Sequence, residues 1–395
     1  MGATKIYDFA VIGAGVFGAW TALTLRQRGA SAILLDAYGP ANSRASSGGE
    51  SRIIRMGYGP SEVYTRWSMR ALPLWKELFA RAGRPELFRE TGVLWIAREN
   101  ESYMLQTLET IAQCGVNFQK FSRDDLRRRY TQIVIDDGSF GIFEPDSGVL
   151  MARRAVQCVV DQARKLGVEY VEAAALPPAA PLASSSGGKL SEIKLNTGAI
   201  VSAGSFVFAC GPWLPKIFPD LLGDRIFPSR QEIFFFGVPS GDLRFSPPAM
   251  PTWLILSDEF YGMPNLESRG FKIAHDRHGP RVDPDTQPRT PTAVSLETAR
   301  QYLALRFPAL KDAPILESRV CQYENTSNGD FLIDRHPAFE NVWIVGGGSG
   351  HGFKHGPSVG TYAASRLLAA RDSDVEIEPR FSLATKQVVQ HRAVY

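Results

Sequence analysis

Three glycines near the start of the chain have the spacing of a phosphate-binding turn. Gly13, Gly15 and Gly18 form the pattern G-x-G-x-x-G, with Val16 and Phe17 between the last two. In such a turn the first glycine permits a tight bend, the second lets a pyrophosphate approach the backbone, and the third allows close packing of helix against strand. The helix that follows presents free N–H groups and a partial positive charge to the phosphates. The pattern therefore predicts a site for a dinucleotide.

The residues around this turn support the same prediction. We expect a strand over Ile6–Ile12, a helix over Ala19–Arg28 and a second strand over Ser31–Asp36. Asp36 is placed to accept hydrogen bonds from ribose hydroxyls, and an acid at this point disfavours a 2′-phosphate. The alternative is a glycine-rich turn without a ligand. The motif alone fits either NAD or FAD, but a turn this early in a long chain, with a later glycine-rich strand–helix crossing, favours FAD.

Two arginines and a distant lysine form a second candidate group. Arg52 and Arg55 lie three residues apart and would share one helix face if their segment is helical. Arg55 is suited to a bidentate clamp on a carboxylate, with Lys354, after the glycine run Gly346–Gly352, as its partner. Two neighbouring cations also favour the neutral state of other cations nearby. The alternative is a solvated basic face.

Several ordered segments resemble one known family. Residues 48–58 read GGESRIIRMGY, residues 320–337 read VCQYENTSNGDFLIDRHP, and residues 346–354 read GGGSGHGFK. With the N-terminal turn, they resemble the monomeric sarcosine oxidase family of FAD-dependent amine oxidases, in the D-amino-acid-oxidase-like superfamily. That family includes N-methyltryptophan, pipecolate and fructosyl-amino-acid oxidases. The similarity runs nearly end to end and includes FEPDSGVL (143–150), PSRQEIFFF (228–236) and FYGMPNLESRGFK (260–272).

The resemblance implies roles for a cysteine and a lysine. Cys321 matches the family cysteine that carries FAD through an 8α-thioether, so we expect a covalent flavin there; the alternative is a buried packing cysteine. Nothing in the composition separates it from Cys114, Cys158 and Cys210. Lys272 matches the family lysine that activates oxygen, where a positive charge stabilises superoxide as it forms. If Lys272 has this role, rather than being a surface lysine at a strand end, the enzyme is an oxidase.

Further family positions would surround the flavin and the substrate. Tyr261 and Tyr323 match tyrosines of the substrate pocket, although core aromatics are an equal alternative. Arg52 lies near the flavin ring in the family pattern, and we expect the catalytic group to be Lys272, Arg52, Tyr261 and Tyr323. His351 either faces the flavin or packs in the core. The expected FAD contacts are Gly13, Gly15, Val16, Phe17, Gly18, Asp36, Ser46, Ser47, Arg52, Cys321, Gly348, Gly350, His351, Gly352, Phe353 and Lys354.

Two departures from the family pattern bear on the substrate. Where the family has a histidine-rich SHHG segment, this chain has Ser46–Gly49 (SSGG), whose side chains are small. Four positions beyond Lys272, where sarcosine oxidase has a histidine, stands Asp276, and His275 comes one residue earlier. We therefore expect His275, with Arg55, Lys354 and Tyr261, to contact the substrate. A larger N-substituted or cyclic amino acid is expected to be a better substrate than sarcosine.

The expected activity is that of an FAD-dependent oxidase of secondary amino acids (N-methyl, N-substituted or cyclic). The substrate would be oxidised to an imine, which hydrolyses to an aldehyde plus an amine or amino acid, and O2 would become hydrogen peroxide. Oxidation of glycated (fructosyl) amino acids, or a flavin dehydrogenase that uses another acceptor, is the alternative within the resemblance. An NAD-dependent dehydrogenase and a non-catalytic flavin-binding subunit are the more distant alternatives.

Composition sets the outer limits. The 395 residues are 44% hydrophobic and 22% charged, which excludes full disorder. Lys plus Arg number 44 and Asp plus Glu 41, a net charge of +3 that is too balanced for a dedicated nucleic-acid binder. The sequence predicts no membrane helix, no signal peptide and no metal site. Four widely spaced cysteines favour a reduced, cytoplasmic setting, and we expect a monomer that meets only a small amine substrate and O2.

The elements that must position these residues fall into separated groups. Nucleotide-fold patterns occur at the start, the middle and the end of the chain, with sheet-rich segments between them. The expected fold is α/β with two domains: a glutathione-reductase-like FAD-binding Rossmann domain interleaved with an antiparallel-sheet substrate domain. The FAD-binding domain would comprise residues 1–85, 148–222 and 322–395, and the substrate domain residues 86–147 and 223–321. Residues 174–188 are expected to form a surface loop or hairpin connection.

Overall fold

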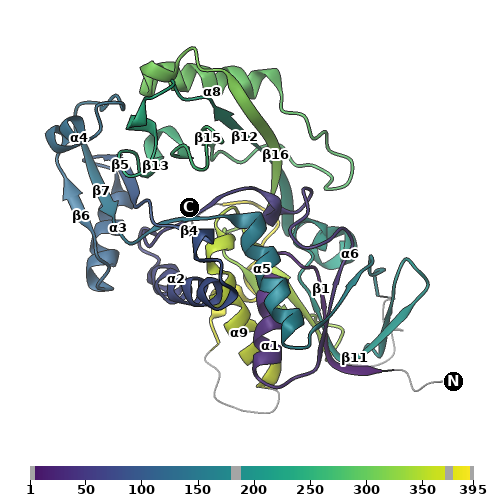
Figure 1. The fold of residues 1–395 in the computed structure, drawn as a ribbon. Coiled ribbons are helices and arrows are strands. Elements are labelled where there is room, and N and C mark those ends of the chain that lie inside the picture. The colour runs from purple at the N-terminus through teal and green to yellow at the C-terminus, as the bar shows by residue number, and fades with distance from the viewer. Residues whose placement is uncertain (1–4, 179–187, 370–376, 392–395) are drawn as a thin grey trace.

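The computed structural model describes residues 5–178, 188–369 and 377–391, which form two large sheets with helices around them (Figure 1). Part of the surface loop expected at 174–188 lies outside the described residues. The first sheet has the strand order β17-β18-β11-β1-β2-β9, and β10 pairs with β11. Its strands are β1 (Ile6–Ile12), β2 (Ala32–Asp36), β9 (Glu169–Glu172), β10 (Glu192–Lys194), β11 (Ile200–Phe208), β17 (Leu332–Arg335) and β18 (Val342–Gly346).

Segments far apart in the sequence build the parallel centre of this sheet. β1 pairs in parallel with both β2 and β11, β11 with β18, and β2 with β9. The peripheral strands β10 and β17 pair antiparallel. The carboxyl ends of the parallel strands therefore meet at one edge, where ligands bind in open α/β sheets. This arrangement confirms the expected Rossmann-type fold.

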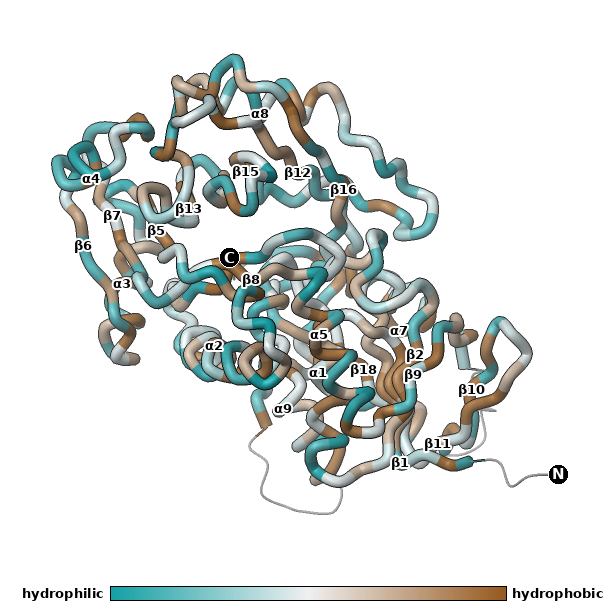
Figure 2. Tube along the Cα trace, viewed as in Figure 1, coloured by the Kyte–Doolittle hydropathy of each residue, from teal (hydrophilic) through white to brown (hydrophobic). Residues whose placement is uncertain are grey.

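The two faces of the parallel sheet are covered differently. Phe9 and Val11 of β1 face a core that also contains residues of helices α1 (Val16–Gln27), α2 (Glu62–Ala82), α5 (Ala152–Lys165) and α9 (Gly356–Leu368). Ala10 and Ile12 alternate to the other face, toward the short helices α6 (Leu214–Ile217) and α7 (Pro219–Leu222). Apolar residues follow the strands of this sheet, whereas the outlying α4 (Arg123–Arg129) is hydrophilic (Figure 2).

The second sheet has eight strands in the order β16-β12-β15-β14-β13-β5-β7-β6, with α8 (Ala293–Arg306) over it (Figure 1). Its pairs are antiparallel except for β5 with β13, so the sheet is mixed rather than purely antiparallel. Helix α3 (Ser102–Gln113) packs near β5. The strands are β5 (Val93–Arg98), β6 (Gln119–Phe121), β7 (Ser139–Glu144), β12 (Ile226–Phe236), β13 (Thr252–Ile255), β14 (Phe260–Met263), β15 (Phe271–His275) and β16 (Ile315–Thr326).

A small three-stranded sheet and short 3-10 helices complete the fold. The small sheet has the order β3-β8-β4, from β3 (Arg52–Ile54), β8 (Gly148–Leu150) and β4 (Phe88–Arg89). The 3-10 helices are η1 (Ser46–Gly48), η2 (Pro85–Leu87), η3 (Gly211–Trp213), η4 (Leu243–Phe245), η5 (Leu256–Asp258), η6 (Pro308–Leu310), η7 (Gly352–His355), η8 (Pro379–Phe381) and η9 (Leu383–Thr385). Within the described ranges, none of the helices combines the length and the hydropathy needed to cross a membrane.

One local expectation is wrong. Arg52 and Arg55 do not share a helix face, because Arg52–Ile54 is strand β3, paired with Gly148–Leu150 of β8. Side chains three apart on an extended chain point to opposite sides. The two guanidinium groups therefore enter different surroundings.

Candidate cofactor and active site

A cavity of about 430 Å³ opens at the carboxyl edge of the parallel sheet. The end of β1, the end of β2, the residue after β11 and β18 each contribute to its wall, through Ile12, Asp36, Ala209 and Val345. The expected cofactor residues that line it are Gly13, Gly15, Val16, Phe17, Asp36, Ser46, Ser47, Arg52, Gly348, Gly350, Gly352 and Phe353, and the expected pocket residue Tyr323 joins them. One cavity thus joins the N-terminal turn to the glycine run near the end of the chain.

The glycine turn has the geometry that the motif predicts. Gly13 has φ +107°, and a Cβ there would lie 2.3 Å from the carbonyl oxygen of Ala209. A Cβ at Gly18 would lie 1.8 Å from the carbonyl oxygen of Gly13, so helix and strand can approach only without it. Gly15 differs, because its nearest neighbour would be Ser47 Oγ at 3.5 Å, which leaves the backbone open to the cavity. The Val16 N–H at the start of α1 donates to that same Oγ at 3.1 Å.

Asp36 borders the cavity at the carboxyl end of β2. Its carboxylate accepts hydrogen bonds from the backbone N–H groups of Ala14 (2.7 Å) and Tyr38 (2.9 Å). Burial raises its pKa above the ordinary value for an aspartate, although these N–H donors act in the opposite direction. These hydrogen bonds hold the carboxylate of Asp36 against the turn at the cavity wall, where it can accept a hydrogen bond from a ribose hydroxyl.

A buried acid that the sequence analysis did not single out also lines the cavity. Glu324 on β16 is 7% exposed and accepts the Gly348 N–H at 3.2 Å through Oε1. Its Oε2 has no hydrogen-bond partner within the described ranges. Burial raises its pKa to about 7. The sequence signal was an acid inside an otherwise core-like strand, QYENT, but the pattern did not show which face would be buried.

Arg52 lies between the cavity and Cys321. Its guanidinium donates to the carbonyl oxygens of Ser46 (2.7 Å) and Ser51 (2.9 Å) and to Cys321 Sγ (3.2 Å). Cys321 is buried and does not itself line the cavity, but its Sγ lies 3.7 Å from the Ser46 carbonyl oxygen. The thiol therefore touches two residues of the cavity wall.

Arg55 and Lys354 come together on one aromatic ring. Arg55 Cζ lies 4.4 Å from the centroid of Tyr58 and 4.6 Å from that of Trp95. Lys354 Nζ donates to Tyr58 Oη (2.7 Å) and to the carbonyl oxygen of His351 (2.9 Å). Both cations are about 95% buried. Burial, and next the charge of Arg55, hold the pKa of Lys354 well below its ordinary value. The structure thus pairs the two residues expected to hold a carboxylate, although neither lines the main cavity.

Lys272 is buried beside the segment that carries Arg52. Its Nζ donates to the carbonyl oxygen and to Oγ of Ser51, at 3.0 and 3.1 Å. The side chain is 2% exposed, so the alternative of a surface lysine is wrong. Burial, followed by the charge of Arg52, lowers the pKa of Lys272 well below its ordinary value, while Glu50 acts to raise it.

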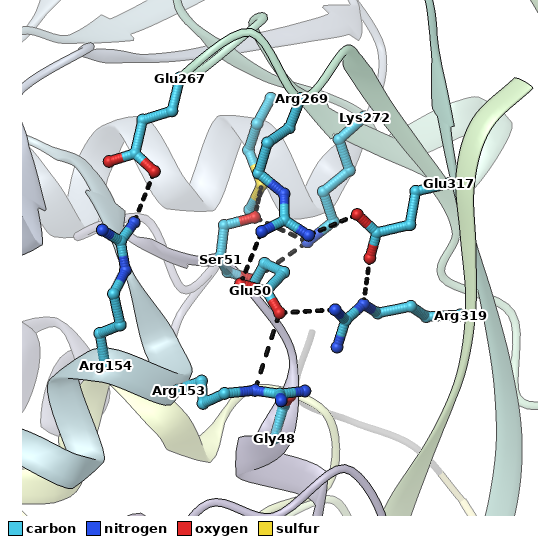
Figure 3. Close-up of polar contacts among 11 residues, drawn as sticks. Gly48, Glu50, Ser51, Arg153, Arg154, Glu267, Arg269, Lys272, Glu317 and Arg319 are labelled. Atoms are coloured by element: carbon cyan, nitrogen blue, oxygen red, sulfur yellow. Dashed lines mark hydrogen bonds and ion pairs between the residues drawn. The ribbon is translucent and has the colours of Figure 1, made fainter.

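Glu50 is the centre of an ion-pair network around Lys272 (Figure 3). Its carboxylate pairs with Arg319 at 2.7 Å, with Arg269 at 3.0 Å and with Arg153 at 3.7 Å. Arg269 and Arg319 also both pair with Glu317. Arginines thus outnumber acids next to the buried lysine, and the region is electropositive.

The two tyrosines meet at an acid. Tyr323 Oη donates to Asp276 Oδ1 at 3.1 Å, and burial raises the pKa of Tyr261 to about 12, with the charge of Arg52 opposing. Burial likewise raises the pKa of Tyr323 well above its ordinary value. Tyr261 and Asp276 also border a small cavity of about 30 Å³. Both tyrosines therefore remain neutral hydrogen-bonding groups at neutral pH.

Two expected histidines lie elsewhere. His275 stacks on Phe260 with ring centroids 4.5 Å apart, and its position three residues from Lys272 on β15 puts it on the opposite face of the sheet. The expectation that His275 contacts the substrate is therefore not supported, and Asp276 takes the place beside the tyrosines. His351 packs on Phe331 and does not line the cavity, which corresponds to the packing alternative.

The cavity fits FAD. It offers an acid for a ribose, an open backbone cradle at Gly15 for a pyrophosphate, and a glycine-walled end at Gly348 and Gly350 for a flat ring. Glu324, whose buried Oε2 accepts from no donor among the described residues, also borders it. In the part of the chain that the structure describes, no three His, Cys, Asp or Glu side chains gather as a metal site.

Known proteins share this architecture and sequence pattern. Monomeric sarcosine oxidase of Bacillus sp. (strain NS-129) is 29% identical over 379 residues, which cover 94% of this chain and 95% of the relative. Peroxisomal sarcosine oxidase of Homo sapiens is 31% identical over 366 residues, 90% of each chain. The solved structure of L-proline dehydrogenase from P. horikoshii has a TM-score of 0.81 at 20% identity and covers 96% of this chain and 97% of that one, a likeness that shows the fold alone.

The family comparison covers nearly the whole chain. The DAO family, described as FAD dependent oxidoreductase, matches residues 8–366. The matched range contains the glycine turn, the cavity wall, Lys272 and Lys354. The chain belongs to the DAO family of FAD-dependent oxidoreductases.

Proposed function

We propose that this protein is an FAD-dependent oxidase of secondary amino acids. The observation that carries the proposal is the buried pair Arg55 and Lys354, which share the ring of Tyr58. Lys354 Nζ donates its hydrogen bonds to two neutral oxygens, so an anionic carboxylate would give this ammonium group a charged partner. The sarcosine oxidases to which the chain is similar act, by their names, on an N-methyl amino acid.

The chain's own residues would bind the substrate and fix its charge. A carboxylate beside Lys354 favours the protonated amine of that lysine and so reverses the effect of burial on its pKa. Tyr261 and Tyr323, which stay neutral, would orient the substrate's amine without competing for its proton. The amine must be neutral to react, so activity should rise as the bound substrate loses a proton.

Bound FAD would supply the two-electron chemistry: a hydride equivalent is lost from the carbon next to the substrate nitrogen, and O2 is the final acceptor. Lys272 would supply positive charge where negative charge develops on oxygen, and Glu50 would help to keep it protonated, whereas Arg52 and Arg319 act against this. The substrate leaves as an imine that hydrolyses to an aldehyde plus an amine or amino acid, and O2 leaves as hydrogen peroxide. We further propose Cys321 as the covalent attachment point of FAD, because its Sγ touches Arg52 and Ser46 of the cavity wall.

The substrate is expected to be larger than sarcosine. Ser46–Gly49 is small, and Asp276 stands beside Tyr323 rather than a histidine. An acid here would favour a substrate that carries a hydrogen-bond donor or a positive charge away from its carboxylate. N-substituted and cyclic amino acids are therefore the first class to test, and glycated amino acids, with their hydroxyl groups, are the second.

We also propose that the chain divides into two interleaved parts. The FAD-binding part would comprise residues 1–85, 148–222 and 322–395, and the substrate part residues 86–147 and 223–321. We expect the protein to be a cytoplasmic monomer. Size-exclusion chromatography with light scattering tests the monomer.

An absorption spectrum and a substrate screen test the function. Purified protein should be yellow, and after acid precipitation the colour should stay in the pellet if the flavin is covalent. N-methyl, cyclic and fructosyl amino acids are then offered in air, with peroxide detection, and again without O2 but with an electron-accepting dye. Peroxide formation supports the oxidase. Turnover with dye alone would replace it with a dehydrogenase, and no turnover in either assay would overturn the proposal.

A further inference from the structure

One of the carboxylates in the cavity wall, that of Glu324, has an oxygen with no hydrogen-bond donor among the described residues. Glu324 is 7% exposed and lines the cavity, and its Oε2 has no hydrogen-bond partner within the described residues. A buried carboxylate oxygen without a donor is costly, because the group has given up its water. Such groups usually mark the place of a missing ligand or solvent molecule.

Glycines leave the space around this carboxylate open. A Cβ at Gly346 would lie 3.3 Å from Oε2, one at Gly348 would lie 3.3 Å from Oε1, and one at Gly211 would lie 3.7 Å from Oε2. The carboxylate therefore sits between the turn that begins at η3 and the glycine run after β18. Side chains at Gly346 or Gly348 would crowd the carboxylate, and Gly211 and Gly348 themselves line the cavity.

Among the described residues, no cation contributes to the charge balance of this carboxylate. The favourable contributions to the carboxylate come from the backbone N–H groups of Gly347 and Gly348, and they are outweighed by burial. Cys210, beside η3, also faces it, but burial raises the pKa of that thiol so far that it stays neutral. Tyr323, the neighbour on β16, stays neutral as well. On the α1 side the nearest cavity residue is the apolar Phe17.

We propose that Glu324 binds the cofactor directly, with Oε2 accepting a hydrogen bond from a donor of bound FAD. FAD carries such donors at its flavin ring N–H, its ribityl and ribose hydroxyls and its adenine amino group, and a carboxylate is a strong acceptor for each. The inference rests on the FAD binding of the proposed function but not on its substrate. Glu324 would thus be a cofactor-binding residue that the sequence motifs did not predict.

FAD release from the holoprotein tests this role. The measurement uses the full chain with Cys321→Ser, which removes the expected covalent link, and follows the rise of flavin fluorescence as FAD dissociates. Glu324→Gln keeps the shape but loses the charge, and we expect release about ten- to hundred-fold faster, the usual effect of losing a charge-assisted hydrogen bond. Glu317→Gln is the matched control, since Glu317 lies on the same strand but pairs with the partly buried Arg269 and Arg319 and does not line the cavity.

The pH dependence of release separates a direct contact from a structural role. Protonation of Glu324 weakens its acceptor, so release from Cys321→Ser should quicken as pH falls toward 5, and Glu324→Gln should flatten this profile. Glu324→Asp, shorter but still ionisable, should release FAD faster and keep the pH dependence, and it serves if the glutamine variant does not fold. Equal release rates for Glu324 and Glu324→Gln, or the same pH profile in both, would overturn the inference.

FAD analogues that each lack one donor identify the group that Glu324 binds. Bound FAD is exchanged for a form methylated at the ring N–H, for forms that lack a ribityl or ribose hydroxyl, and for a form without the adenine amino group. The analogue without the donor to Glu324 should make release from the Glu324 and Glu324→Gln proteins equal. If the glutamine variant still differs with every analogue, the carboxylate acts on the fold and not on the cofactor. Because no substrate is present, a failed peroxide screen would leave this result unaffected.

Discussion

Removal of the buried charge at Lys272 should slow the reaction with oxygen far more than the reaction with substrate. The change is Lys272→Met, which keeps much of the side chain's length and apolar bulk in a site that is 2% exposed. The lost interactions are the hydrogen bonds to Ser51 at 3.0 and 3.1 Å. Little water can enter to replace the ammonium group, so the effect of its charge is lost nearly in full.

The magnitude follows from the charge and its surroundings. A unit charge about 4–6 Å from developing negative charge contributes about 3–4 kcal/mol at an effective dielectric constant near 20. Removal of one such preorganised group typically costs about 10²–10³ in rate, which is the loss that we expect here. Arg52, whose charge already acts on Lys272, remains and sets the residual rate.

Stopped-flow spectroscopy separates the two half-reactions. Protein reduced by substrate without O2 is mixed with oxygenated buffer, and the return of flavin absorbance gives the rate of reoxidation. Lys272→Arg is the control, because it keeps the charge. The pKa of Lys272 is lowered, so its charged form is lost as pH rises through that lowered value, and oxygen reactivity should fall with rising pH well before 10.5. An unchanged reoxidation rate in Lys272→Met would refute the reasoning.

Three further changes test other parts of the site. In Cys321→Ser the flavin should be bound without a covalent link, so acid precipitation should release it into the supernatant. Flavin that stays in the pellet would show that another residue is the attachment point. Gly13→Ala should lower stability by at least about 2 kcal/mol in chemical denaturation, and should lose FAD, because its φ of +107° disfavours a side chain and the Cβ would lie 2.3 Å from Ala209 O. Lys354→Met, or Arg55→Met, should lower kcat/KM for amino acids about ten- to hundred-fold, with no such loss for an amine that lacks the carboxylate; an equal loss for both would remove these cations from the carboxylate site.

The features that the sequence predicted well are those set by local spacing. The glycine turn depends on three residues within one strand–helix connection, and the contacts of Gly13 and Gly18 follow the motif directly. The strand Ile6–Ile12 has the bounds that its apolar run indicates. Such features need no knowledge of distant partners, because backbone sterics and the exclusion of a Cβ determine them.

The features that the sequence did not predict depend on pairing across long distances. Strand β3 forms by pairing with residues 148–150, about a hundred residues later in the chain. The three-residue spacing of Arg52 and Arg55 also fits one face of a helix, so the spacing alone did not reveal the strand. His275 was placed by position along the chain, but the side on which it lies is decided by the alternation of β15. The burial of Glu324 depends on the glycine run after β18, which packs against its carboxylate and is far from it in the local sequence pattern. Each case involves a partner that no short pattern contains.

Lys272 and Lys354 lie in similar surroundings, and this similarity links substrate binding to the reaction with oxygen. Each is buried next to an arginine, and each has its pKa lowered by burial first and by that arginine second. Among the described residues, both amines donate their hydrogen bonds to neutral oxygens rather than to carboxylates. A substrate carboxylate would supply the charged partner at Lys354, and the negative charge that develops on oxygen would do so at Lys272. On this reasoning the stability lost by burying the lysines is recovered only when their anionic partners are present, which is why each should discriminate so strongly for them.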